Sequence, residues 1–265
     1  MVHCIFTFVC CYNNDKILKA MLLSSLMKIG SVDISLKQNM KYRHLLIDNR
    51  QGKYIGAAQA FNIELRAKGN TVGDYIVFCH QDIAFDDDTL WKRAEEEFRK
   101  NPNQLLGVAG MAKEGETISN LKYLDTNSYI TRRQTDVKKE VETLDECCFI
   151  IPKHLFERLP FDEKVCPFWH LYAADYCYAV REKYDIRSYV LPEMIYHKES
   201  TLDGLYTDSK FLKSIWRLSR KYHRTNPIVY TPCYIIRTNP FWTVTKLSRT
   251  FLKNKMRQWL YRLSY

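Results

Sequence analysis

Apolar and polar residues along the first 100 positions follow a regular order of strands and helices. Continuous apolar runs at 4–11, 44–47 and 75–79 predict strands that are buried on both faces, as in the centre of a parallel sheet. Apolar residues at helical spacing predict helices over 15–29, 56–67 and 88–100. Strands that alternate with helices in this way predict a doubly wound, mostly parallel sheet with one ligand crevice.

The second half of the chain has shorter apolar segments. Those at 105–111, 143–151 and 187–191 predict further strands, and the polar stretch 112–139 predicts loops with a hairpin near 123–131. Helices are predicted over 152–158 and 171–184, and two more over 210–224 and 241–264.

Polar residues follow each of the three predicted parallel strands. They are Cys11-Tyr12-Asn13 after the first strand, Asp48-Asn49 after the second and His80-Gln81-Asp82 after the third. The carboxyl ends of parallel strands form the ligand crevice of such a sheet, and a His and an Asp with one residue between them can grip a metal or a diphosphate-bearing ligand. A polar surface turn is the alternative. Since neither G-x-G-x-x-G nor a Walker sequence is present, side chains and a metal would have to hold a nucleotide.

Charge divides the chain into two parts. The net charge is +10, yet residues 209–265 contain 13 of the 40 Lys and Arg and no Asp or Glu. A basic amphipathic helix over 241–264, with Trp and Tyr, is typical of an anchor at an anionic membrane surface. The alternatives are docking of its apolar face on the rest of the chain or on a second copy in a homodimer. Nucleic acid is disfavoured as a partner, because the tail has a full apolar face and no recognised nucleic-acid motif.

The nine cysteines show no C-x-x-C spacing, which favours reduced, buried thiols over disulfides or a zinc site and predicts a cytosolic protein. The first residues lack the pattern of a secretory signal, and no apolar run is long enough to span a membrane.

In its order of segments the chain resembles family 2 glycosyltransferases, which have the nucleotide-sugar-binding A-type fold. Further segments carry the resemblance: Ala60-Phe61-Asn62, Leu144-Asp145-Glu146, Phe161-Asp162-Glu163, Asp175 on a helix and His197 after a strand. The match is closest to a bacterial subgroup with His-Gln-Asp in place of Asp-x-Asp. It implies an α/β fold with a Rossmann-like, mixed, mostly parallel sheet flanked by helices in a catalytic domain 1–205. Residues 1–111 would form its nucleotide-binding half and 112–205 its acceptor half, and 206–265 a basic amphipathic helical tail.

The resemblance also assigns roles in donor binding. Asp82, the last acid of the triplet, would coordinate a divalent cation on the donor diphosphate, with His197 completing the metal site. The cation would be Mn²⁺ or Mg²⁺, with Mn²⁺ favoured if a histidine ligates. His197 could instead be a satisfied histidine at a strand end. The remaining donor-binding residues would be Cys11, Tyr12, Asn13, Asp48, Asn49, Asn62, His80 and Gln81.

The catalytic motif of the family is a Glu-Asp pair, one further residue and an Asp. Here Tyr172-Ala173-Ala174-Asp175 keeps only the last acid. Asp175 is the first choice for the general base, with Asp145 or Glu146 as the second. A structural ion pair of Asp175 with Arg181 or another basic group is the alternative. Trp169, His170 and Tyr172 would form a wall for the acceptor sugar, although Trp169 could equally lie in the core.

Taken together, the resemblance implies an inverting, metal-dependent glycosyltransferase that uses a nucleotide-sugar donor and a saccharide acceptor carried on a lipid. The expected setting is synthesis of a bacterial surface polysaccharide, on the inner face of the cytoplasmic membrane. Loss of two acids from the catalytic motif also allows an inactive nucleotide-sugar-binding relative. A nucleic-acid-binding protein that uses the basic tail is a third hypothesis.

Overall fold

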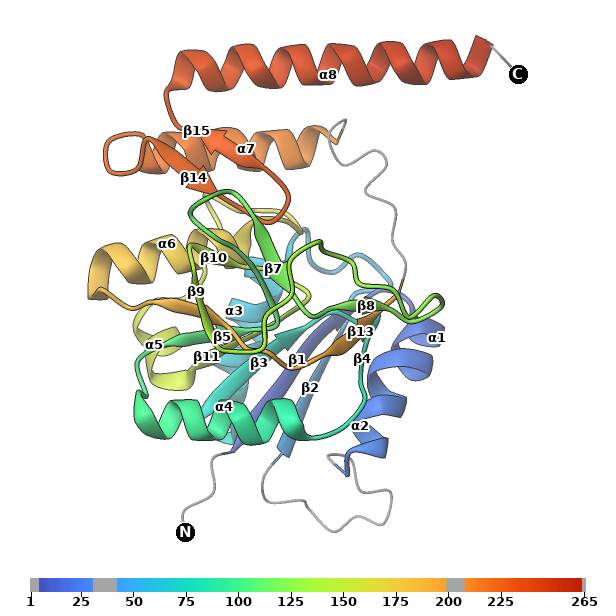
Figure 1. Ribbon diagram of the computed structural model, residues 1–265, viewed down its shortest axis with the longest axis vertical. Coiled ribbons are helices and arrows are strands. Elements are labelled where there is room, and N and C mark those ends of the chain that lie inside the picture. Colours follow the sequence, from blue (N-terminus) through green and yellow to red (C-terminus); the bar gives the residue numbers. More distant parts are fainter. Residues whose placement is uncertain (1–4, 31–41, 199–207, 264–265) are drawn as a thin grey trace.

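The computed structural model describes residues 5–30, 42–198 and 208–263. Within these ranges the central sheet has seven strands in the order β2-β1-β3-β11-β5-β12-β9 (Figure 1). In that order they are Tyr42–Asp48, Phe6–Tyr12, Tyr75–Cys79, Cys148–Pro152, Leu105–Gly107, Ser188–Val190 and Lys139–Val141. Only β11 and β9 among them run against the other strands. The predicted mixed, mostly parallel sheet is confirmed.

Helices cover both faces of this sheet. Along β1 the side chains alternate between two hydrophobic clusters, with Val9 on one face and Phe8 and Cys10 on the other. Helices α3, α5 and α6 pack on the face of Val9, whereas α1, α2 and α4 pack on the opposite face. Their bounds are α1 Asp15–Leu18, α2 Ser24–Lys28 after a π-helical turn Lys19–Leu23, α3 Ala57–Lys68, α4 Thr89–Lys100, α5 Lys153–Arg158 and α6 Tyr172–Tyr184.

Three smaller sheets extend this framework. They are β10-β6-β7 (Thr143–Leu144, Ala109–Met111, Thr117–Ser119), β4-β13-β8 (Ile83–Phe85, Ile195–His197, Lys122–Tyr123) and β14-β15 (Ile228–Tyr230, Ile235–Arg237). The single strands predicted at 105–111 and 143–151 are wrong, because each run crosses from the central sheet into the sheet of β6 and β10. Both halves of each run are buried, so the apolar pattern continues through the break.

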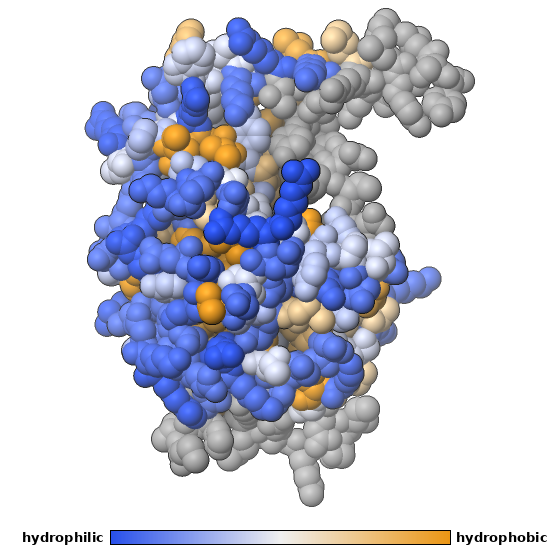
Figure 2. All heavy atoms as spheres, viewed as in Figure 1, coloured by the Kyte–Doolittle hydropathy of each residue, from blue (hydrophilic) through white to orange (hydrophobic). Residues whose placement is uncertain are grey.

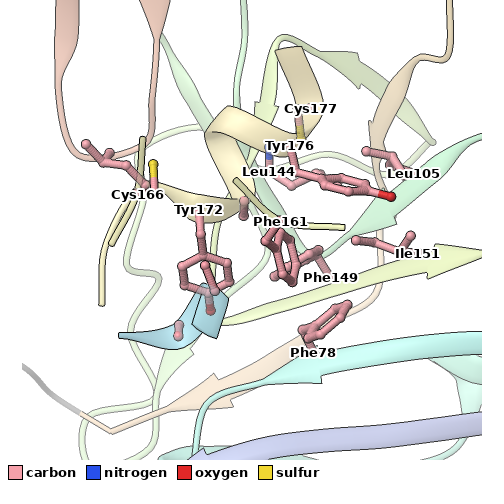
Figure 3. Packing of buried hydrophobic residues seen from close by; sticks show 14 of the residues in the cluster. Phe78, Leu105, Leu144, Phe149, Ile151, Phe161, Cys166, Tyr172, Tyr176 and Cys177 are labelled. Carbon is pink, nitrogen blue, oxygen red and sulfur yellow. Dashed lines mark hydrogen bonds between the residues drawn. The ribbon is translucent and has the colours of Figure 1, made fainter. Parts of the chain in front are cut away.

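The core beside α6 is rich in aromatic rings. Figure 3 shows Phe78 and Phe149 of the sheet close to Phe161 and Tyr172. The rings of Phe161 and Tyr172 meet edge to face with centroids 5.4 Å apart, a geometry that contributes about 0.5–1.5 kcal/mol beyond area burial. This packing fixes the start of α6 against the central sheet.

The basic tail packs in two different ways. Helix α7 (Ser209–Tyr222) buries Phe211, Ile215 and Leu218 in the same cluster as α6, so its apolar face docks on the rest of the chain. Helix α8 (Pro240–Leu263) crosses the top of the molecule over α7 and β15 (Figure 1). None of the helices in the described ranges combines the length and apolarity of a membrane span. The division of the chain at residue 205 stays a prediction.

Candidate active site

A short backbone ladder brings His197 to the end of β3. Strand β4 follows directly after His80-Gln81-Asp82, and β13 pairs antiparallel with it, so that His197 lies opposite Ile83. The Lys198 N–H donates to the Asp82 carbonyl oxygen at 2.9 Å and extends the ladder by one step. Main-chain pairing therefore holds Asp82 and His197 together, although 114 positions separate them in the sequence.

Side chains of His80, Asp82 and His197 converge. Each offers one ligand atom, and these atoms lie within 4.8 Å of one another. Asp82 Oδ1 is 3.7 Å from His197 Nε2 and 3.9 Å from His80 Nδ1. Ligand atoms that are each about 2.1 Å from one ion lie roughly 3–4 Å apart, so the two distances from Asp82 Oδ1 fit a divalent cation. His80, which we had placed among the donor-binding residues, also belongs to this group of candidate metal ligands.

Hydrogen bonding prepares His197 to be a ligand. Its Nδ1 lies 2.6 Å from the carbonyl oxygen of Lys198. A carbonyl oxygen can only accept, so the proton of the neutral ring is on Nδ1 and the lone pair of Nε2 faces Asp82. Desolvation lowers the pKa of His80, although 42% of the side chain is exposed, and the charges of Asp82 and Asp145 oppose this shift.

A cavity of about 1,080 Å³ opens beside this group. Its size is at the upper end of the range for small-molecule sites. The cavity brings together the predicted residues His80, Asp82, Asp145, Glu146, His170 and His197. Four segments distant in sequence therefore share one cavity: the end of β3, the turn before β11, the loop before α6 and the end of β13.

Glu146 occupies an unusual position in this cavity. Its Oε1 is buried without a hydrogen-bond partner. The carboxylate lies near the backbone N–H groups of Leu171, Tyr172 and Ala173 at the start of α6, which lower its pKa. Burial, reinforced by Asp145, raises the pKa of Glu146 well above its usual range. The carboxyl group of Glu146, in the turn before β11, thus lies near the start of α6. The two acids of the family's catalytic motif that this chain lacks would be at the start of the same helix.

Asp175 lies away from the cavity lining. It is 2% exposed, and both of its carboxylate oxygens contact Lys221 Nζ, at 2.8 and 3.0 Å. The Tyr222 hydroxyl also donates to it at 2.8 Å. Burial raises the pKa of Asp175 in spite of this pairing. The geometry supports the structural ion pair, with Lys221 of α7 as the partner; Arg181 pairs with Glu142 instead.

The other predicted donor residues lie at the neighbouring strand ends, outside the cavity lining. Tyr12 of β1 is opposite Asp48 of β2, next to Cys11. Both oxygens of Asp48 contact Arg50, whose hydrogen bonds lower the pKa of Asp48 to about 2. The side chain of Asn49 exchanges two hydrogen bonds with the backbone of Tyr54, at 2.7 and 3.2 Å. These contacts lie within the protein and stabilise the loop after β2. Contacts of Asp48 and Asn49 with a nucleotide-sugar donor stay a prediction.

Gln81 and Asn62 make contacts within the protein. The Gln81 side chain accepts from the Asn13 and Asn14 N–H groups and donates to Asn13 Oδ1, which fastens the β1–α1 loop to the metal-binding group. Asn62 is 7% exposed, and its amide group binds the backbone of Phe161 in both directions. The structure therefore uses Asn62 to hold a core segment and does not bring it to the cavity.

Only one residue of the predicted acceptor wall lines the cavity. That residue is His170, whose ring meets Phe211 of α7 edge to face. Tyr172 is 3% exposed in the aromatic core (Figure 3), and Trp169 packs against the same cluster. Neither Tyr172 nor Trp169 is among the residues that line the cavity, and their contact with an acceptor stays a prediction.

Sequence reasoning missed several cavity residues. Arg132 and Arg133 come from the segment that we had read as an irregular loop, and Arg133 pairs with Glu116. Asp208 and Cys233 come from the tail, which we had separated from the acceptor half. Neither group lies on a periodic element or in a motif, so the only available signal was the charge of Arg132-Arg133.

Solved glycosyltransferase structures share this fold. GalNAc-T7 with UDP, GalNAc and Mn²⁺ matches 83% of this chain with a TM-score of 0.56 at 11% identity, and the chain spans about half of that protein, 48%. The mannosyltransferase PcManGT from Pyrobaculum calidifontis, in complex with GDP-Man and Mn²⁺, matches 94% of this chain and 74% of its own with a TM-score of 0.57 at 12% identity. No protein-family model and no curated protein matches the sequence. The chain has the A-type glycosyltransferase fold, as predicted.

Proposed function

We propose that this protein transfers a sugar from a nucleotide-sugar donor to a saccharide acceptor. The observation that carries the proposal is the convergence of His80, Asp82 and His197 on a large cavity at the carboxyl end of β3, in an A-type glycosyltransferase fold. Open α/β sheets bind their ligands at this edge. The two similar structures each contain Mn²⁺ with a nucleotide or nucleotide sugar, which supports the same ligands here.

Asp82, His197 and His80 would hold the divalent cation. Two imidazoles and one carboxylate favour Mn²⁺ over Mg²⁺, which prefers oxygen ligands. When bound, the cation would neutralise charge on the departing nucleoside diphosphate. Gln81 fixes the loop that carries these ligands, and Arg132 places a further positive charge at the cavity wall.

Glu146 is the general base in this proposal, with Asp145 beside it. Burial raises its pKa, which is the direction that a base near neutral pH requires, and Glu146 is among the residues that line the cavity. The acceptor hydroxyl would give its proton to Glu146 as its oxygen forms a bond with the sugar C1. The bond between C1 and the diphosphate oxygen breaks on the opposite face, so the anomeric configuration inverts.

The biological setting is part of the proposal. We infer an acceptor carried on a lipid, a role in bacterial surface polysaccharide synthesis, and a position on the inner face of the cytoplasmic membrane. The basic tail supports this inference, because its charge and exposed apolar residues suit an anionic surface. An inactive relative that only binds nucleotide sugars is the second candidate, favoured by Ala173 and Ala174 in place of acids.

The test is incubation of the full chain with UDP- and GDP-sugars and Mn²⁺, with release of nucleoside diphosphate and the anomeric configuration of the product as readouts. We expect release with at least one donor, and a loss of at least about 100-fold in Asp82→Asn and Glu146→Gln. Asp86→Asn is the matched control, since Asp86 pairs with Lys28 outside the cavity lining. Donor binding without turnover on any acceptor would favour the inactive relative, and absence of donor binding would refute both.

A further inference from the structure

A second cavity, of about 330 Å³, lies in the tail between α8 and the β14–β15 hairpin. Three cations line it, Arg237, Lys246 and Arg249, together with the aromatic residues Tyr234 and Trp242. Among the described residues that line it, none carries a carboxylate, and residues 209–265 contain no Asp or Glu. The positive charge of this cavity is therefore not neutralised by acids of its own segment.

Two of the three cations lie close together on α8, and the third comes from β15. Lys246 and Arg249 are three positions apart on the helix and so project from the same side, while Arg237 reaches the cavity from β15. Lys246 Nζ lies 4.8 Å from the centre of the Tyr234 ring, a cation–π contact that restrains the lysine at the cavity wall. Because like charges repel, an arrangement of three cations without an acid favours binding of an anion.

An exposed apolar stripe adjoins the cavity. Phe241, Leu252 and Met256 share one side of α8 and are 73%, 65% and 59% exposed. Trp242, also exposed, lines the cavity together with the cations, whereas Thr243 and Leu247, farther round the helix, are buried. Hydrophilic and hydrophobic residues lie side by side along this part of the tail, at the top of Figure 2.

We propose that this cavity binds the phosphate headgroup of an anionic membrane lipid, while Phe241 and Trp242 insert beside it at the membrane surface. The cations supply charge-assisted hydrogen bonds to phosphate oxygens. Aromatic rings with an apolar body suit the level of the lipid headgroups. The helix would lie flat on the membrane, with its buried side on α7 and its apolar stripe toward the acyl chains. The inference rests on the membrane position proposed above and deepens it, but the site is separate from the transfer site, so loss of vesicle binding and loss of sugar transfer can be told apart.

The occupant follows from the combination of the two features. A soluble phosphate ligand would account for the cations and leave the apolar stripe unexplained. A second copy of this chain would bring the same basic tail and add repulsion. Nucleic acid would leave Leu252 and Met256 exposed to water. An anionic lipid surface complements both the charge and the apolar side chains.

The experiment measures flotation of the full-length protein with two kinds of vesicle, phosphatidylcholine alone and an equimolar mixture of phosphatidylcholine and phosphatidylglycerol, at about 0.15 M salt, where charges are screened beyond about 8 Å. We expect binding to the mixed vesicles only. The triple variant Arg237→Glu, Lys246→Glu and Arg249→Glu should bind at least about a hundredfold more weakly, since each cation contributes to attraction by the surface.

The matched control is Lys213→Glu, Arg220→Glu and Arg224→Glu, which changes the net charge equally on exposed positions outside this cavity. It should retain binding within about tenfold. Equal losses in both triple variants would overturn the site in favour of diffuse charge. Thermal unfolding checks that all variants fold.

Three further results would overturn the proposal. The first is that inorganic phosphate stabilises the wild type but not the cavity variant, while neither protein binds vesicles. That result would indicate a soluble ligand. The second is binding of duplex DNA, without vesicle binding, that is lost in the cavity variant. The third is a dimer, seen by light scattering, that the Phe241→Ser and Trp242→Ser double variant dissociates without any effect on vesicle binding.

Discussion

Asp82 and Asp175 have opposite surroundings, although the sequence suggested a functional role for both. Asp82 lies at a strand end, a quarter exposed, with two histidine nitrogens within 4 Å and a large cavity in front of it. Asp175 lies on α6 inside the protein, with its carboxylate occupied by Lys221 and Tyr222. The two imidazole nitrogens lie beyond hydrogen-bond distance of Asp82 Oδ1, so its carboxylate is available to a cation, whereas the ammonium group of Lys221 already pairs with Asp175.

This difference teaches that the partners of an acid decide its role. An acid needed for chemistry has to remain accessible to the ligand, and Asp82 and Glu146 both line the large cavity. An acid that joins two helices is surrounded by donors, as Asp175 is between α6 and α7. The following predictions test this contrast, from the largest expected effect to the smallest.

Stability should distinguish the two acids most strongly. Lys221→Met should lower the free energy of unfolding by about 3 kcal/mol, because it leaves the buried charge of Asp175 unpaired. Asp175→Asn should lower it by less, because Lys221 keeps its second partner, Asp162, at 3.1 Å. Asp82→Asn should change it by less than about 0.5 kcal/mol. Urea unfolding measures these values. The double variant Asp175→Asn, Lys221→Met should lose less than the sum of the single changes; strict additivity would argue against the pair.

Metal affinity should show the reverse order. Asp82→Asn should weaken Mn²⁺ binding by about 100-fold, because it removes the anionic ligand from a group of three. Asp175→Asn should leave the affinity unchanged once the folded fraction is taken into account. The spectroscopic signal of free Mn²⁺ during titration gives the affinity directly, without any turnover. Unaltered Mn²⁺ binding by Asp82→Asn would remove the basis of the proposed metal site.

Alkaline pH should weaken the Asp175 network. Burial lowers the pKa of Lys221, but Asp175 and Asp162 outweigh it and raise the pKa above the ordinary 10.5. A raised pKa in the folded state means that this contribution to stability is complete below pH 10.5 and is lost as the pH rises through the folded-state pKa. Urea unfolding between neutral pH and pH values above 10.5 should show this loss of stability. The variant Lys221→Met should lose less stability over the same range, because it has no lysine to deprotonate at this position. An identical pH profile in the variant would contradict the assignment.

The smallest effect concerns the loop that supports Asp82. Gln81→Ala removes three hydrogen bonds to the β1–α1 loop and should cost about 1 kcal/mol of stability, since the site is exposed. It should also weaken Mn²⁺ binding by a few-fold, because the loop that carries the ligands loses its attachment. Gln59→Ala, which loses one weak contact at 3.3 Å, is the control. An effect no larger than that of the control would separate the loop from the metal site.

The sequence by itself determined the fold class, the strand ends and Asp82. Short continuous apolar runs such as 75–79, bounded by polar residues, favour buried strands, and the residues that follow such strands in a parallel sheet share one edge. The match of His197 to the metal site also came from the sequence, by resemblance, and the pairing of β13 with β4 gave it a physical basis.

Only the tertiary structure decided which acid reaches the cavity. Helical spacing shows that Asp175 lies on α6, but not that Lys221 from a helix 46 positions later meets it there. The same holds for Glu146, whose proximity to the start of α6 depends on packing of β11 against that helix, and for α7, which a reading by charge had assigned to a separate tail. Periodicity encodes which face of an element is buried, because that follows from local geometry. The partner that buries it is set by contacts between distant segments, which no local pattern records.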